Sequence, residues 1–341
     1  MSSLVHSSPA LTFELVARCS TTRARASTIK LPHGPVQLPI FMPVATQASL
    51  KGITPQQLEE TGCVLCLNNT YHLGLKPGQE VLDAIGGAHK LQGWNHNILT
   101  DSGGFQMVSL LKLAKVMEEG LDDVLVTTCP DKARMREAME RSTQNLFCII
   151  QGGLDLDMRR LSGGEAKTDY CRVVATCTAL LPELKPRYVM GIGYPEDLVV
   201  SVALGADMFD CVWPTRTARF GNAVTKHGVL NLRGARFAND FGPIESGCGC
   251  ASCRTGDGGM GITRAFVHHN ASKETIAAHV LTIHNVWYQL NLMKEIRESV
   301  IEDRFPDYIR HFFASLHANK TDYPEWAVEA LRGVGVDLMS E

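Results

Sequence analysis

One stretch of the sequence combines a carboxylate with closely spaced arginines, which suits chemistry on a phosphorylated substrate. The apolar run from Met208 to Val212 contains Asp210, and Arg216 and Arg219 follow it. A carboxylate at the end of a buried strand can attack a carbon atom as a nucleophile, and neighbouring arginines can bind phosphate. An isolated motif of this kind is more often a helix-capping Asp beside solvated arginines, so the rest of the chain must decide.

A second stretch contains three cysteines close enough in sequence to share a metal ion. Cys248, Cys250 and Cys253 lie in a short segment with Gly247 and Gly249 on either side of the first. Three thiols in such a turn suit one tetrahedral ion, which needs a fourth ligand from elsewhere. A site closed by four protein ligands has no position for a reacting water, so we expect structural zinc and no metallohydrolase chemistry. His284 is the best candidate for the fourth ligand, because we expect it to open a long amphipathic helix. His279 is the next candidate, and His268 and His269 are weaker ones.

Short apolar runs must position these residues. Each run is nearly continuous, as in parallel strands buried on both faces, and each ends in polar residues or glycine. Helical patterns such as 195–205 lie between them, and the capping-box sequence Thr54-Pro55-Gln56-Gln57 predicts the start of the first helix. Strands that alternate with helices predict an α/β fold, a (β/α)8 TIM-type barrel with a small zinc-binding insertion near the C-terminal end. A doubly wound sheet is the rival, but no Gly-x-Gly-x-x-Gly follows the first strand. The expected strands are 37–44, 63–67, 97–100, 147–150, 188–190 and 208–209.

Composition limits the classes of function. The chain has 341 residues and a net charge of −3, which argues against a DNA-coating surface but allows a local basic patch for RNA. No run of about 18 apolar residues predicts a membrane span. Eleven cysteines without framework spacing favour a reducing compartment. We expect a loose N-terminal tail at 1–10, the barrel with C-terminal helices at 11–245 and 286–341, and a zinc-binding subdomain at 246–285.

Eight motifs follow one another along the chain: 69–73, 100–106, 150–153, 161–165, 187–191, 207–212, 214–216 and the cysteine cluster with His284. Any one motif is weak evidence, but together they cover the chain from about Phe13 to Phe313 and are highly specific. Their order resembles the tRNA-guanine transglycosylase family, and within it the catalytic subunit of the eukaryotic members that insert queuine. The family exchanges guanine at the wobble position of certain tRNAs for a modified 7-deazaguanine.

The resemblance implies a double displacement through a covalent ribosyl-enzyme, which parallels a retaining glycosidase. It assigns Asp210 as the nucleophile and Asp101 as the proton acceptor and general acid/base. Asn69 and Thr70 are expected to hold Asp101 in position. Asp122 is expected to read the guanine edge, although a carboxylate at a helix start is the alternative. The other residues expected to bind the base are Ser102, Gly103, Gly104, Phe105, Gln151, Gly153, Leu161, Ser162, Gly163, Met190 and Gly191.

The resemblance also predicts the substrates. A bulkier residue stands at the position of Gly163 in bacterial members, which use a smaller base, so glycine leaves room for the cyclopentenediol arm of queuine. The tRNAs expected are those with GUN anticodons, whose unpaired loop can be bound by stacking and by arginine. The residues expected to contact this RNA are Gly193, Tyr194, Thr215, Arg216, Thr217, Ala218 and Arg219.

Partners and compartment follow from the resemblance as well. It implies a heterodimer with a homologous accessory subunit, structural Zn²⁺, no DNA partner and a cytoplasmic location, and it leaves open peripheral association with the mitochondrial outer membrane. A non-catalytic accessory subunit or another base-exchange member of the family is an alternative, although Asp101 and Asp210 argue against the accessory subunit. An unrelated barrel enzyme, such as a lyase or a glycosidase, is a further alternative that binding of anticodon stem-loop RNA would exclude.

The sequence is shorter than the family pattern at three places, near residues 120, 143 and 160. The first leaves little strand before Asp122, and the third removes a lead-in strand and one glycine of the base pocket. We interpret these joins as the ends of missing mobile segments; the alternative, true deletions, would leave the barrel incomplete and would argue against activity.

Overall fold

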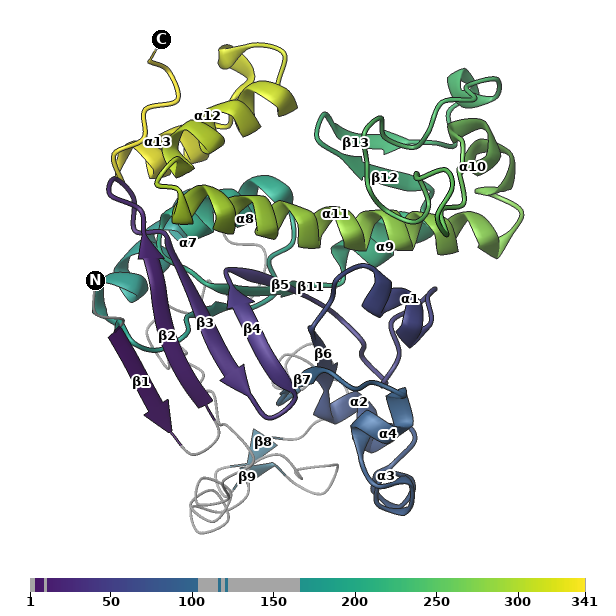
Figure 1. Cartoon of the computed structure of the whole chain (residues 1–341), viewed down its shortest axis with the longest axis horizontal. Coiled ribbons are helices and arrows are strands. Elements are labelled where there is room, and N and C mark those ends of the chain that lie inside the picture. The colour runs from purple at the N-terminus through teal and green to yellow at the C-terminus, as the bar shows by residue number, and fades with distance from the viewer. Residues whose placement is uncertain (1–3, 9–10, 104–115, 118–119, 122–165, 341) are drawn as a thin grey trace.

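In the computed structural model, which describes residues 4–8, 11–103, 116–117, 120–121 and 166–340, parallel strands form the centre of the fold (Figure 1). β11 lies between β10 and β5, and β6 pairs with β7. A parallel bridge between Val44 and Leu67 joins these two groups, so β11, late in the chain, neighbours the early strands. The strands are β5 (Ile40–Pro43), β6 (Leu65–Asn69), β7 (Asn97–Asp101), β10 (Tyr188–Val189) and β11 (Met208–Cys211).

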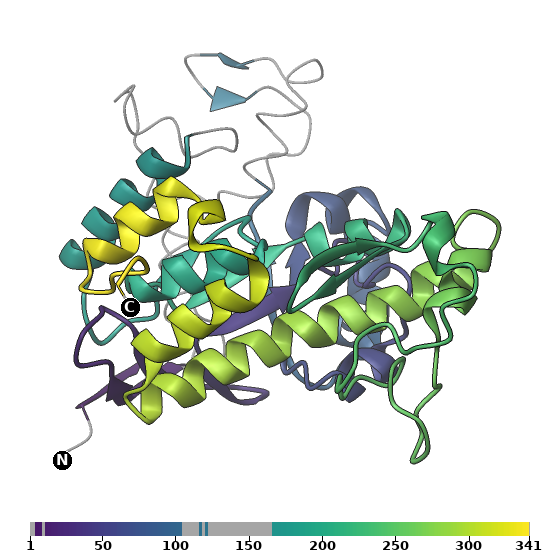
Figure 2. The same cartoon turned by 90° about the horizontal axis from the view of Figure 1, so that it is seen from above.

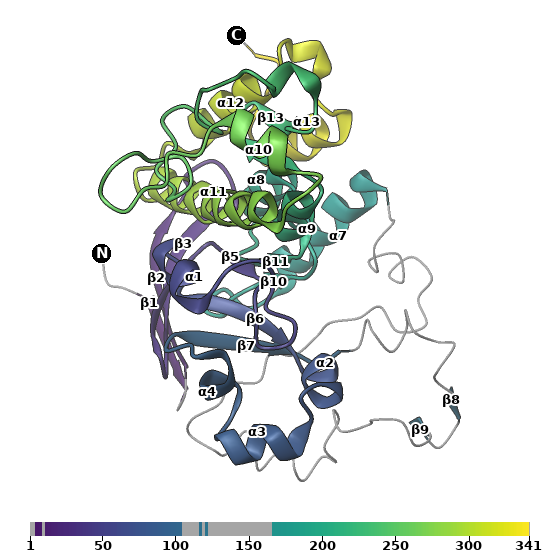
Figure 3. The same cartoon turned by 90° about the vertical axis from the view of Figure 1, so that its right-hand side faces the viewer.

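An antiparallel sheet stands beside the parallel strands (Figure 3). Along its second strand, buried and more exposed residues alternate, because successive side chains of a strand point to opposite faces. The buried residues, among them Phe13 and Ile29, share a core with Met42 and Met208 of the parallel strands. The sheet therefore closes one side of the core that lies under the site. Its strands are β1 (Leu4–Ser8), β2 (Leu11–Arg18), β3 (Arg25–Leu31) and β4 (Gly34–Leu38).

One long helix, α11 (Thr275–Ile301), runs across the molecule and contacts both ends of it (Figures 1 and 2). At one end lie the C-terminal helices α12 and α13, and at the other end lie β12, β13 and α10. The remaining elements are α1 (Pro55–Glu60), α2 (Thr70–Leu75), α3 (Gln79–Ile85), α4 (Ala88–Gln92), β8 (Val116–Met117), β9 (Gly120–Leu121), α7 (Lys167–Leu180), α8 (Pro195–Ala203), α9 (Trp213–Arg219), β12 (Asn222–Thr225), β13 (Gly228–Asn231), α10 (Arg264–Asn270), α12 (Phe305–Leu316), α13 (Glu325–Arg332) and the 3₁₀ turns Ala235–Phe237 and Lys320–Asp322.

The mixed α/β class and the capped first helix are confirmed. Thr54 accepts a hydrogen bond from the backbone N–H of Gln57, and Gln57 accepts one from the N–H of Thr54, as the capping-box pattern predicts. Among the described residues, the parallel strands do not form one closed sheet. The expected strand 147–150 lies outside the described residues.

Three local predictions were wrong. Residues 4–8, expected in a loose tail, form β1, which pairs with the otherwise free edge of β2. The expected single strand 37–44 is two strands, β4 and β5, on either side of Pro39, which has no N–H to donate to a ladder. His284 does not open its helix, because α11 begins at Thr275 and also runs through residue 285, where we expected the subdomain to end.

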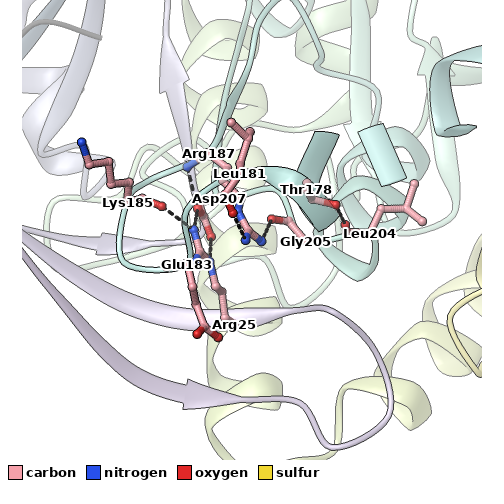
Figure 4. Close-up of polar contacts among 9 residues, drawn as sticks. All are labelled: Arg25, Thr178, Leu181, Glu183, Lys185, Arg187, Leu204, Gly205 and Asp207. Atoms are coloured by element: carbon pink, nitrogen blue, oxygen red, sulfur yellow. Dashed lines mark hydrogen bonds and ion pairs between the residues drawn. The ribbon is translucent and has the colours of Figure 1, made fainter. Parts of the chain in front are cut away.

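A buried ion pair fixes the start of β11 (Figure 4). The guanidinium of Arg25 in β3 donates to both carboxylate oxygens of Asp207, at 2.9 and 2.5 Å. The same guanidinium also donates to the backbone carbonyls of Glu183 and Lys185, and the N–H of Arg187 donates to Asp207 at 2.7 Å. Arg25 is 4% exposed and Asp207 is 0% exposed, so water does not compensate either charge. The pair therefore ties the antiparallel sheet to the segment that leads into β10 and β11.

Replacement of Asp207 by Asn should destabilise the fold strongly, because it leaves the Arg25 charge buried without its partner. We expect a loss of about 3–5 kcal/mol in the free energy of unfolding, measured by urea denaturation. Glu183→Gln is the matched control, since Glu183 forms an ion pair with Arg18 in which both side chains are half exposed. Such a surface pair contributes at most about 1 kcal/mol. Equal unfolding midpoints for the two variants would contradict the prediction.

Candidate active site and metal centre

Asp101 and Asp210 lie at the carboxyl ends of parallel strands and on the same face of them. Asp101 ends β7 two residues after Leu99, and Asp210 lies in β11 two residues after Met208. Leu99 and Met208 belong to the same core, and residues two apart on a strand share a face. Both carboxylates therefore sit on top of this core, as the strand-end pattern predicts.

Asp210 is a buried carboxylate held by two donors. The hydroxyl of Tyr188 in β10 donates to Oδ1 of Asp210 at 2.5 Å, and the N–H of Gly191 donates to the same oxygen at 3.0 Å. Burial raises the pKa of Asp210, the two hydrogen bonds lower it, and the charge of Asp101 raises it further. The influence of Asp101 on this pKa shows that the two carboxylates are electrostatically coupled.

Asp101 is less buried and has more donors. Asn69, its register partner on β6, donates from Nδ2 to Oδ2 at 3.0 Å. The backbone N–H groups of Ser102 and Gly103 also bond to this carboxylate. Burial raises the pKa of Asp101 and these three hydrogen bonds lower it. Gly103 has a φ of +79°, and a Cβ there would lie 2.6 Å from Cβ of Tyr71, so this turn requires glycine.

The expected role of Asn69 is confirmed, and the same side chain also shapes the backbone. Its Oδ1 accepts from the N–H of His72 at 3.1 Å, which caps α2, while its Nδ2 holds Asp101. Thr70 is the first residue of α2. Of the two partners expected for Asp101, Asn69 alone bonds to it in the part of the chain that the structure describes.

The remaining residues expected around the base are divided between the described and the undescribed parts of the chain. Met190 lies at the end of β10 with a 41% exposed side chain, beside Gly191. The site therefore offers two carboxylates of unequal environment, which suits one nucleophile and one proton-transfer group. Outside the described residues lie Gly104, Phe105, Asp122, Gln151, Gly153, Leu161, Ser162 and Gly163.

The segment after Asp210, expected to contact RNA along its length, is the helix α9. Arg216 and Arg219 are exposed, but Thr215, Thr217 and Ala218 are buried. The hydroxyl of Thr215 donates to the carbonyl of Val212 at 3.0 Å, which turns it away from solvent. The two arginines are thus the side chains of this group that are free to meet RNA.

An aromatic pair lies next to Asp210. Tyr194 is 53% exposed and its ring centroid is 4.8 Å from that of the half-buried Trp213, the first residue of α9. Gly193 before it is buried, and a Cβ there would lie 2.4 Å from Cβ of Cys211. Gly193 therefore packs against β11, and Tyr194 carries the exposed surface. Sequence analysis did not single out Trp213, although its position directly after the Asp210 run was the signal available.

Four side chains form a cluster that could hold a metal ion. The ligand atoms of Cys248, Cys250, Cys253 and His284 all lie within 4.8 Å of one another. Nδ1 of His284 lies 3.6, 3.5 and 3.4 Å from the three sulfur atoms. A tetrahedral zinc ion with its usual bond lengths holds nitrogen and sulfur ligands about 3.5 Å apart, so the donors are spaced for such an ion.

The surroundings of His284 favour a ligand role. Its Nε2–H donates to the carbonyl of Val224 at 2.8 Å, which leaves Nδ1 without a proton and facing the thiols. Hydrogen bonds from Cys248 and Cys253 lower the pKa of the Cys250 thiol, while hydrogen bonds with the other two thiols raise the pKa of Cys248, so Cys250 is the first of this pair to form the thiolate that a metal binds. The position of His284 therefore fits the predicted ligand role.

The other histidine candidates have different partners. His279 contacts Nε2 of Gln57 at 3.0 Å, and His268 and His269 contact the carbonyls of Leu232 and Ala238. None of the three belongs to the cluster among the residues that the structure describes.

Two polar residues of the site were missed from the sequence. Tyr188, the first residue of β10, was part of a recognised motif but received no role. Asn285 is buried in α11, where its side chain bonds to the backbone of Pro214, Asn222 and Val224. Nothing in the sequence around Asn285 distinguishes it, because its partners come from distant segments.

Comparisons with known proteins agree with this arrangement. A profile described as "Queuine tRNA-ribosyltransferase" matches residues 19–123 and 160–318. The chain is 53% identical to the queuine tRNA-ribosyltransferase catalytic subunit of Schizosaccharomyces pombe, with 99% of this chain and 100% of that protein aligned. It is 37% identical to the catalytic subunit of Caenorhabditis elegans over 96% of this chain and 99% of that protein. It is 36% identical to the queuine tRNA-ribosyltransferase of Pediococcus pentosaceus over 92% of this chain and 98% of that protein.

The lengths of these alignments agree with the observation that the sequence is shorter than the family pattern near residues 120, 143 and 160. The alignment to the Schizosaccharomyces pombe protein spans 405 positions and this chain has 341 residues, so that relative contains segments with no counterpart here. The family profile likewise leaves residues 124–159 unmatched. Similarity of this extent excludes the unrelated barrel enzyme. The chain belongs to the queuine tRNA-ribosyltransferase family, the tRNA-guanine transglycosylases.

Proposed function

We propose that this protein is the catalytic subunit of a queuine tRNA-ribosyltransferase, which exchanges guanine at the wobble position of GUN-anticodon tRNAs for queuine. The observation that supports it most is the pair of coupled carboxylates, Asp101 and Asp210, on one face at the ends of parallel strands. The accessory subunit of the family lacks these carboxylates, so their presence favours the catalytic subunit.

The unequal environments of the two carboxylates fit the two roles. Asp210 attacks ribose C1′ and displaces guanine, which forms a covalent ribosyl-enzyme, and the incoming base then attacks the same carbon. Asp101 gives a proton to the departing base and takes one from the arriving base. Its position at the end of β7, held by Asn69 and two backbone N–H groups, keeps it fixed through both steps.

The RNA would lie over the exposed residues next to Asp210. Arg216 and Arg219 in α9 can bind phosphate or stack on splayed bases, and Tyr194 offers an exposed ring. Selection of queuine over the smaller bacterial precursor rests on Gly163 through the family resemblance alone.

Two structural features complete the proposal. The cysteine cluster and His284 would hold a structural zinc ion, since a site filled by four protein ligands has no open position for substrate. The five parallel strands would belong to a closed (β/α)8 barrel. The parallel pairing of the late strand β11 with the early strand β5 supports it, because a barrel brings the two ends of its strand series together.

Partner and location are proposed from the family. The names of the eukaryotic relatives, which call them catalytic subunits, support a heterodimer with an accessory subunit. We propose a cytoplasmic location, with peripheral association with the mitochondrial outer membrane as a further option. In the described part of the chain, no helix has the length and apolar character needed to cross a bilayer.

The covalent intermediate can be detected directly. The protein, its accessory subunit and an anticodon stem-loop with wobble guanine should give a protein–RNA band that survives a denaturing gel. Asp210→Asn should abolish this band, because the amide cannot form the ester. Asp101→Asn should slow its appearance by about 10²–10⁴-fold, the usual contribution of general acid/base catalysis.

Asp307→Asn, a change at an exposed side chain of α12, is the control and should leave the band unchanged. A band that survives Asp210→Asn would move the nucleophile elsewhere, first to Asp101. Absence of any band despite tight RNA binding would favour a non-catalytic subunit or an incomplete barrel.

Adduct formation should decline on acidification at a pH above the ordinary range of an aspartate. Burial raises the pKa of Asp210 from 3.8, and only the ionised carboxylate attacks, so the rate falls as pH falls through the raised pKa. Single-turnover rates between about pH 4 and pH 8 measure this, with circular dichroism to verify that the protein stays folded. A rate that stays constant down to about pH 4 would contradict the prediction.

Loss of the metal should unfold the segment around the cysteine cluster, and it should leave the carboxylates Asp101 and Asp210 in the protein. Cys253→Ser should lower the bound zinc from one ion per chain toward zero and destabilise the protein by several kcal/mol, since metal binding is coupled to folding. Elemental analysis and thermal unfolding measure the two effects. Cys177→Ser is the control, because Cys177 is a free cysteine outside the cluster. Wild-type protein purified without zinc would refute the assignment.

A further inference from the structure

The two donors to Asp210 share one of its oxygens. The Tyr188 hydroxyl and the Gly191 N–H both bond to Oδ1, at 2.5 and 3.0 Å. Within the described ranges of the chain, no hydrogen bond reaches Oδ2. The two oxygens of the carboxylate are therefore not equivalent, and one of them is available for reaction.

The strand pairing explains why Tyr188 reaches this carboxylate. Tyr188 in β10 pairs in register with Met208 in β11, two residues before Asp210. Residues two apart share a face, so the phenol ring extends along the core toward Asp210. After β10 the chain turns at Gly191, which has a φ of +75° and directs its N–H back to the same oxygen. The arrangement thus depends on the fold of two adjacent strands.

The tyrosine is suited to donate a hydrogen bond and unsuited to transfer a proton. Burial, the charge of Asp210 and the charge of Asp101 all raise the pKa of Tyr188 far above its usual value. The phenol therefore stays protonated at any working pH. Its hydrogen bond favours the ionised form of Asp210, which burial and the charge of Asp101 both oppose.

We propose that Tyr188 is a positioning residue that, with the Gly191 N–H, occupies Oδ1 of Asp210 and so makes Oδ2 the atom that bonds to ribose C1′. This proposal rests on the proposed function. As the bond from Oδ2 to C1′ forms, the bond from C1′ to the guanine ring nitrogen breaks. The electron pair stays on the base, which takes the proton of the Asp101 carboxyl. In the second displacement the incoming base bonds to C1′, its proton returns to Asp101, and the pair of the ester bond returns to Oδ2.

Tyr188→Phe tests the proposal, because it removes the hydroxyl and keeps the ring that packs on the core. We expect an unchanged dissociation constant for the anticodon stem-loop and a single-turnover rate of adduct formation lower by about 10- to 100-fold at neutral pH, the range for one hydrogen bond to a charged group. We also expect the acid limb of the pH–rate profile to move to higher pH, because the ionised form of Asp210 has lost a donor.

Tyr170→Phe is the matched control. The Tyr170 hydroxyl is also buried, and it lies 2.6 Å from Oγ of Ser201, between α7 and α8 and away from both carboxylates. Its loss should affect thermal stability and leave the rate and the pH profile unchanged. If the wild-type protein forms the adduct, two results for Tyr188→Phe would overturn the proposal. One is the wild-type rate, and the other is a slower rate with an unshifted pH–rate profile. A wild-type protein that forms no adduct would overturn the proposed function, and this inference with it.

Discussion

The buried ion pair between Arg25 and Asp207 sets the position of β11, the strand that carries Asp210. Asp207 immediately precedes β11, and its carboxylate also accepts from the N–H of Arg187, which immediately precedes β10. One carboxylate thus fixes the starts of the two strands that carry Asp210 and Tyr188. A buried pair of this kind contributes little net stability compared with apolar packing, but it is costly to break. Here the pair restricts how β10 and β11 can be placed, because a shift of either strand would separate the charges of Arg25 and Asp207 or break the bond from Arg187.

The helix α11 provides a second constraint on the site, because its polar side chains connect the cysteine cluster to the segments beside Asp210. His284 faces the three thiols and holds the carbonyl of Val224, and the next residue, Asn285, bonds to the carbonyl of Pro214 in α9. One turn further, Gln289 donates to the carbonyl of Gly193, just before Tyr194. A single polar row on one rigid helix therefore connects the cluster to the two segments with exposed residues beside Asp210. A structural metal ion can in this way position an RNA-binding surface without taking part in the reaction.

The sequence was sufficient for the residues whose position depends on local pattern. Buried parallel strands need continuous apolar runs, so their ends, and with them Asp101, Asn69 and Asp210, were visible without a structure. The cysteine cluster was equally clear from spacing. Residues whose partners depend on strand register or on distant segments were not predictable, which is why Tyr188 and Asn285 were missed. For the same reason, the sequence did not show which residues of α9 are exposed. The burial of Thr215, Thr217 and Ala218 depends on packing against α11 and the region of the cysteine cluster. The base-reading residues, among them Asp122 and Gly163, stay predictions because they lie outside the described residues.

The surroundings of the two aspartates agree with the roles proposed for them, nucleophile for Asp210 and proton transfer for Asp101. A nucleophile must stay ionised near neutral pH, yet it must also be dry enough to attack carbon, and these needs conflict because burial favours the protonated form. At Asp210 both needs can be met, because two donors bond to Oδ1 and favour the ionised form. Among the described residues no donor bonds to Oδ2, so this oxygen can attack. At Asp101 the donors come from Asn69 and from two backbone N–H groups of a glycine turn, which hold a more exposed carboxyl in place. The charge of Asp101 raises the pKa of Asp210, so the pair holds one proton more readily than two negative charges. The first displacement requires this proton on Asp101, and the donors Tyr188 and Gly191 favour that state because both bond to the carboxylate of Asp210.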